Sequence, residues 1–208
     1  MECELSFENA RALVNRFLSV ISWRRRSWVR EIMIAYGSIR VGIGRPGLVD
    51  PVITRFDQSA LQSPDTREKR LAIALYREAG GLNSAPYQFL GYFKIINIAR
   101  RRGSDQIAWI NSALPHVVDQ PALARLEQLR GQHPDVGAYL YESGRCAVAH
   151  AAEESVVDPD DPADLLRLSL DLPLIRILAE AFMENELQLK GWPVAPHRVQ
   201  ASIGEHEQ

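Results

Sequence analysis

The C-terminal part of the chain carries a long run of apolar residues at helical spacing, and this run constrains the fold more than any other feature. The spacing predicts a helix from Ala163 to Leu189, with a kink at Pro173. The apolar side covers a wide arc, so we expect this helix at the centre of a bundle or at a dimer interface. That side consists of Leu165, Leu168, Leu172, Ile175, Leu178, Phe182 and Leu187.

An acidic run from Asp158 to Asp164 precedes this helix. Clustered acids can bind calcium, but this run lacks the glycine and the distal glutamate of an EF-hand loop. Aspartates beside a proline are typical of a helix N-cap, and we favour that interpretation. The sequence Gly191-Trp192-Pro193 should end the helix, and residues 191–208 are predicted to form a mobile tail.

Shorter amphipathic segments fill most of the preceding sequence. Ser6, Ser63 and Ser84 are plausible N-caps for three of them, and Ser63-Pro64 has the cap-then-proline order of a helix start. Short connections favour neighbouring helices that run up and down. We therefore predict a mainly α fold, an antiparallel bundle of about five helices within residues 63–190. The helices are expected at 7–21, 63–79, 84–102, 107–114, 122–129, 134–152 and 163–189.

Residues 1–62 form a predicted N-terminal appendage and linker ahead of the bundle. Val29–Ala35 and Ser38–Ile43 are short and β-branched, which indicates a small β-hairpin. A lone hairpin is unstable, so we expect it to pack on the bundle. Gly42–Gly47 matches G-x-G-x-x-G, but Pro46 continues a loop where a dinucleotide site needs a helix. No cofactor is predicted.

Composition excludes several classes of protein. The net charge of −2 provides no overall basic surface, so any contact with nucleic acid must come from local arginine clusters. Two cysteines, Cys3 and Cys146, form neither a disulfide framework nor a zinc site, and no metal site is predicted. The sequence lacks a signal-peptide pattern and an apolar run of about 18 residues. We expect a cytoplasmic protein without a membrane span.

The stretch from Tyr139 to Ala151 concentrates candidate chemistry. Arg145 and His150 are separated by four small or apolar residues. Histidine exchanges protons near neutral pH, and arginine has the planar charge that fits phosphate oxygens. Together they could serve phosphodiester cleavage. The alternative is a surface arginine and a histidine packed against a neighbouring helix. On an ideal helix Cys146 and His150 share a face, with Arg145 beside it.

The same stretch resembles the Arg-x4-6-His signature of the HEPN superfamily, and its surroundings are similar to the methylamine-utilisation J-type branch. Residues 75–79 and 87–96 extend the resemblance, which covers roughly Arg67 to Leu189. Active members commonly carry Asn, Asp or His after the arginine, whereas this chain has Cys146. The resemblance implies a homodimer in which two Arg-His pairs share one cleft.

The resemblance also implies a metal-independent endoribonuclease, as found in toxin or defence systems, with an antitoxin as a possible protein partner. His150 would be the general acid or base for attack by a ribose 2′-hydroxyl, Arg145 would stabilise the phosphorane-like state, and Cys146 would line the site. Two alternatives are a non-catalytic helical dimer that binds nucleotide, RNA or protein, and an accessory protein of amine metabolism.

Two arginine clusters are candidate RNA contacts. The first is flanked by Trp23 and Trp28, which could stack on bases. We favour the alternative that these tryptophans fold onto the core. The second cluster could instead face the carboxyl end of a helix, and both interpretations stay open. The clusters are Arg24, Arg25 and Arg26, and Arg100, Arg101 and Arg102.

Overall fold

The computed structural model describes residues 6–26, 29, 64–149, 157–158 and 160–189, and this part of the chain is mainly helical, as predicted. The predicted hairpin, linker and C-terminal tail lie outside the described residues, Val29 apart. The division of the chain at residues 62 and 190 therefore stays a prediction.

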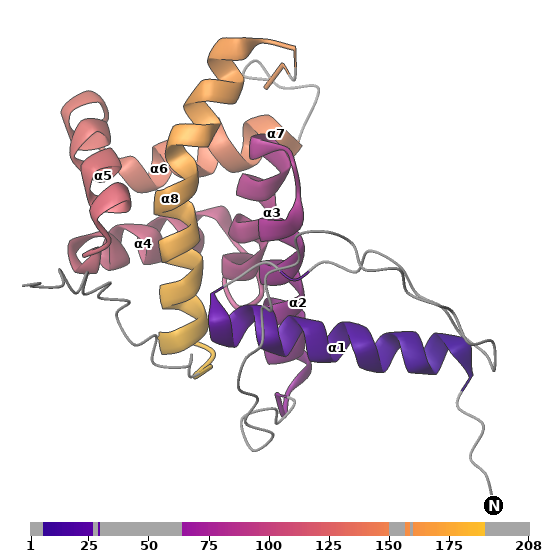
Figure 1. Cartoon of the computed structure of the whole chain (residues 1–208). Coiled ribbons are helices and arrows are strands. Elements are labelled where there is room, and N and C mark those ends of the chain that lie inside the picture. Colours follow the sequence, from indigo (N-terminus) through magenta and orange to yellow (C-terminus); the bar gives the residue numbers. More distant parts are fainter. Residues whose placement is uncertain (1–5, 27–28, 30–63, 150–156, 159, 190–208) are drawn as a thin grey trace, which may run out of the picture.

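Helix α8, Pro162–Asn185, runs through the middle of the helical body (Figure 1). It makes its most extensive contact with α3, Ala85–Asn97, and a further one with α5, Gln120–Gln132. The sequence predicts the last helix either at the centre of the bundle or at a dimer interface, and these contacts place it at the centre. Its buried positions are Leu168, Asp171, Leu174, Ile175, Leu178, Ala179, Phe182 and Met183.

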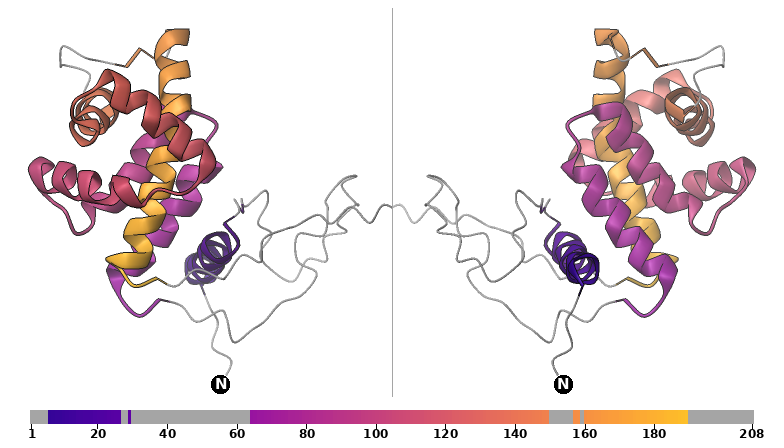
Figure 2. Two further views of the ribbon diagram at one scale, coloured as in Figure 1. Left: turned by 90° about the vertical axis from the view of Figure 1, so that its left-hand side faces the viewer. Right: turned by 90° about the vertical axis from the view of Figure 1, so that its right-hand side faces the viewer.

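Helices α2, Arg67–Gly81, and α3 pack closely together. A Cβ on Gly91 would lie only 2.8 Å from Cβ of Ala79, so the glycine permits this close approach. Helix α1, Phe7–Arg25, packs against α2 and is seen end-on in Figure 2, which places it at a steep angle to α8. Its buried residues are Ser19, Val20, Ile21, Ser22 and Trp23, all in its second half.

The remaining helices form the other side of the body. Helix α4, Gly103–Ala113, continues into a 3₁₀ turn, η2, at Leu114–His116. After α5 comes the segment of the Arg-x4-His motif. It consists of α6, Val136–Tyr139, a π-helix, η3, Leu140–Cys146, and α7, Ala147–Ala149. A single α-helix over 134–152 was therefore the wrong expectation.

Side-chain caps fix most of the helix starts. Ser6 accepts a hydrogen bond from the backbone N–H of Asn9, and Asp161 accepts one from Ala163, so both predicted caps are confirmed. The predicted start at Ser63-Pro64 is wrong. Thr66 caps α2 by accepting from Lys69 N–H at 3.2 Å, and Pro64 instead offers its carbonyl to the Arg70 guanidinium.

Candidate functional site

The segment around Arg145 is a π-helix and not the regular α-helix that the sequence indicates. The backbone N–H of Ala147 donates to the carbonyl of Glu142, five residues earlier. Residues Leu140–Cys146 therefore do not follow the ideal α-helical geometry that the sequence predicts for the stretch around Arg145. π-Helical turns inside α-helices occur frequently at functional sites. This segment is therefore a candidate functional site.

Arg145 is partly buried and contacts two residues of its own segment. Its guanidinium carbon lies 5.5 Å from the ring centroid of Tyr141, within cation–π range. Its Nη1 donates to Sγ of Cys146 at 3.5 Å. Cys146 is also partly buried and is a free thiol. The predicted partner His150 lies outside the described residues, so the Arg145–His150 pair stays a prediction.

Two glycines let this segment pack tightly on the body. A Cβ on Gly144 would lie 2.4 Å from ring atoms of Phe89, and a Cβ on Gly103 would lie 2.5 Å from the hydroxyl oxygen of Tyr141. Phe89 is fully buried on α3, so it cannot swing away into solvent. Gly144 thus fixes the distance between the motif segment and α3.

We expect Gly144→Ala to lower the free energy of unfolding by about 1–3 kcal/mol, because the added methyl group overpacks a filled site. Urea unfolding followed by circular dichroism measures this change. Gly131→Ala is the matched control, since nothing lies within 4 Å of a Cβ there. Its stability should stay unchanged or rise slightly. Equal stability of the two variants would contradict the packing assigned to Gly144.

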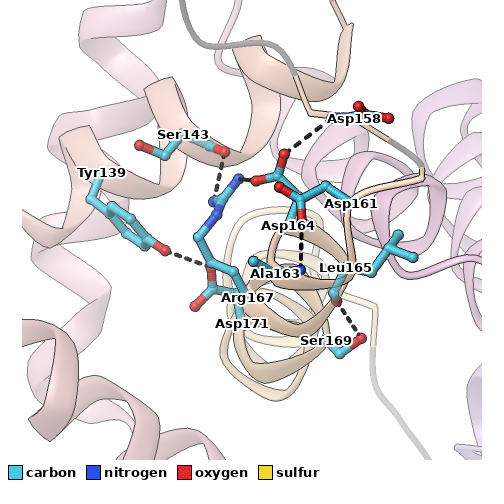
Figure 3. A network of polar contacts seen from close by, with 10 residues as sticks. All are labelled: Tyr139, Ser143, Asp158, Asp161, Ala163, Asp164, Leu165, Arg167, Ser169 and Asp171. Atoms are coloured by element: carbon cyan, nitrogen blue, oxygen red, sulfur yellow. Dashed lines mark hydrogen bonds and ion pairs between the residues drawn. The ribbon is translucent and has the colours of Figure 1, made fainter.

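A polar network joins the motif segment to α8 (Figure 3). Nη1 of Arg167 donates to the backbone carbonyl of Ser143 at 2.9 Å, inside the π-helix. The same guanidinium pairs with Asp164 at 3.3 Å. The Tyr139 hydroxyl donates to Asp171 at 2.9 Å, so a second bond ties the segment to α8.

Asp171 is a fully buried carboxylate at the centre of this network. Nε of Arg125 on α5 pairs with it at 2.8 Å, and Tyr139 donates to its other oxygen. Burial, followed by the Asp171 charge, raises the pKa of Tyr139, which therefore stays a neutral donor. His133 stacks on the Tyr139 ring with centroids 4.2 Å apart. The network links α5, α6 and α8.

Sequence reasoning did not single out Asp171, Arg125, Tyr139 or Arg167. One signal was available. Asp171 is an acid among the leucines of the apolar side of the last helix, and a buried charge needs a buried partner. The partners themselves come from α5 and α6 and carry no marker in the sequence.

The two arginine clusters are not brought to Arg145. Arg26 lies over the Trp23 ring at 3.6 Å and pairs with Glu180 and Glu184. Arg100 pairs with Glu186 at 2.7 Å. Glu180 is 13 residues beyond Arg167, which is about 20 Å along α8. Arg26 and Arg100 thus pair with acids at or directly after the carboxyl end of α8, whereas the motif segment contacts its other end.

The members of the two clusters differ in exposure. Trp23 is buried against Tyr76, as the structural interpretation predicted, whereas Trp28 lies outside the described residues. The second cluster does not end α3, because the helix stops at Asn97 and all three arginines follow it. Arg24 is partly buried, and the three exposed members are Arg25, Arg101 and Arg102.

Neither a metal centre nor a membrane span is found in the described part of the chain. Its histidine, cysteine and acidic side chains do not form a group of three that could hold a metal ion. Among the same residues, no helix has the length and apolar character that crossing a bilayer requires.

The chain was compared with known protein families. The family model described as methylamine utilization protein MauJ matches residues 72–184, more than half of the chain. The chain belongs to the MauJ family. The match extends from α2 to the end of α8 and includes the π-helix and the Asp171 network, but not α1. No curated protein and no solved structure gives a significant match.

Proposed function

We propose that this chain is an accessory protein of methylamine utilisation that works by binding and not by cutting RNA. The observation that carries the proposal is the MauJ family match, which spans nearly all of the bundle. Arg26 and Arg100 support it because they form ion pairs with Glu180 on α8 and with Glu186 directly after it, which leaves their side chains less available to phosphates. In this proposal the helical bundle is the binding module, and α8 is its central helix.

Growth of a deletion strain tests this proposal. In the organism that carries the gene, loss of the chain should slow growth on methylamine as the nitrogen source and leave growth on ammonium unchanged. Reintroduction of the wild-type gene should restore the rate on methylamine. A deletion strain that grows normally on methylamine would contradict the accessory role.

A second candidate is the metal-independent endoribonuclease that the Arg-x4-His pattern suggests. The π-helix at Leu140–Cys146 favours it, since such segments are frequent at functional sites. In this candidate the protein is a homodimer, His150 moves the proton, Arg145 stabilises charge on the phosphorus oxygens, and Cys146 lines the cleft. An antitoxin could be its partner.

Cleavage of labelled RNA in EDTA distinguishes the candidates. The ribonuclease candidate requires 2′,3′-cyclic phosphate ends, a loss of at least about 10²-fold in His150→Ala, and poor activity in Arg145→Lys. It also requires a dimer by light scattering. The accessory role predicts that wild-type RNA cleavage is no faster than that of His150→Ala. Cleavage that depends on His150 would establish the second candidate instead.

A further inference from the structure

A small cavity lies between the carboxyl ends of α4 and α8, away from the motif segment. It has a volume of about 210 Å³. Val117, Ile177 and Ala181 contribute apolar walls, and Trp109 adds an aromatic one. Sites for drug-sized ligands are usually about 300–1,000 Å³, so this cavity suits a molecule of only a few heavy atoms.

The charges around the cavity favour a cation. Helix α4 continues through η2 to His116 and α8 ends at Asn185, and both residues line the cavity. The carboxyl end of a helix carries partial negative charge. Glu186 adds a carboxylate at the same place, and this carboxylate is paired with Arg100. Trp109 supplies an indole ring, the aromatic group that attracts cations most strongly.

The carboxylate of Glu186 is held in place by two neighbours. Nε1 of Trp109 donates to its Oε1 at 3.2 Å, and Nη2 of Arg100 donates to its Oε2 at 2.7 Å. Trp109 is itself fixed by edge-to-face packing on buried Phe182, with centroids 4.9 Å apart. The carboxylate and the indole are therefore preorganised, while Arg100 is a cation that competes with any cationic ligand.

We infer that this cavity binds a short-chain alkylammonium ion. The ammonium group lies beside Glu186 and the two helix ends, and the alkyl group lies against Trp109 and the apolar walls. The inference stands on the chemistry of the cavity, and its biological role rests on the proposed function. Ligand binding is measured on the purified chain, whereas the proposed function is tested by growth of cells. The inference and the proposed function can therefore fail independently.

Titration of the ¹⁵N-labelled full chain with alkylammonium chlorides at pH 8 tests the inference, with the Trp109 indole N–H resonance as the reporter. Methylammonium has two heavy atoms, which limits its Kd to roughly 6 mM at best. Two further methylene groups should make propylammonium bind about 15-fold tighter. The neutral 1-propanol should bind at least about tenfold more weakly than propylammonium.

Substitutions of Glu186 and Arg100 should change the affinity for propylammonium in opposite directions. Glu186→Gln removes the negative charge and should weaken propylammonium binding by about tenfold. Arg100→Gln removes the competing cation and should tighten it, whereas a site for anions would lose affinity in this variant. Ala181→Leu fills the cavity and should abolish binding, while Ala124→Leu on the exposed side of α5 should not affect it.

Melting temperatures confirm that each variant is folded. If Ala181→Leu fails to fold, the Glu186 and Arg100 variants still decide the question. Indole shifts that do not saturate, equal binding of 1-propanol and propylammonium, or weaker binding in Arg100→Gln would each overturn the inference.

Discussion

The Asp171→Ala substitution should lower the free energy of unfolding by about 3–5 kcal/mol, as expected when one member of a buried ion pair is removed. The Asp171 side chain is 1% exposed and that of Arg125 is 11% exposed. The substitution leaves the Arg125 charge buried without its carboxylate and removes the acceptor of the Tyr139 hydroxyl. Urea unfolding of the purified variant measures the loss.

Two further variants separate the ion pair from general effects of removing an acid. Asp160 lies at an exposed position before α8. Asp160→Ala should therefore change the free energy of unfolding by no more than about 0.5 kcal/mol. The double variant Arg125→Met/Asp171→Leu should recover much of the loss, because well-packed apolar residues can replace a buried pair. If Asp171→Ala is as stable as wild type, the ion pair does not hold α5, α6 and α8 together.

Stability should also fall steeply above pH 10, through Tyr76 and Tyr92. Burial raises the pKa of both hydroxyls, and the Glu180 carboxylate adds to the shift of Tyr76. An unfolded tyrosine ionises near pH 10, whereas the folded one keeps its proton. The unfolded state therefore gains stability as pH rises, by up to about 1.4 kcal/mol per pH unit for each tyrosine.

Unfolding measured at pH 9, 10, 11 and 12 tests this expectation. The Tyr76→Phe/Tyr92→Phe variant should lose less stability over this range than wild type, because phenylalanine does not titrate. Tyr87→Phe, at a position 61% exposed, should follow the wild-type curve. A double variant that declines as steeply as wild type would mean that other groups cause the alkaline unfolding.

Much of the helical framework could be predicted from local patterns. The spacing of Leu168, Ile175 and Phe182 indicated the central helix, and Asp161 and Ser6 marked helix starts through capping chemistry that involves only a few adjacent residues. The start of α2 was placed too early because Ser63-Pro64 and Thr66 both resemble caps. Only the structure shows that Thr66 bonds to Lys69.

The candidate site was less predictable because it depends on tertiary contacts. The π-helix has no distinct apolar period, so the sequence suggested a regular helix through Arg145. The clash that a side chain at Gly144 would meet comes from Phe89, more than fifty residues earlier. The roles of Arg26 and Arg100 depend likewise on distant acids, Glu184 on α8 and Glu186 directly after it. Local sequence cannot distinguish such structural arginines from arginines that bind RNA.

Growth of a deletion strain complemented with His150→Ala tests the central claim most directly, that the chain serves methylamine utilisation by binding. The ribonuclease candidate requires His150, whereas the proposed accessory binding function assigns it no role. The account predicts that His150→Ala restores growth on methylamine to the wild-type rate. A strain that recovers only with the wild-type gene, although the variant protein is folded and equally abundant, would contradict it.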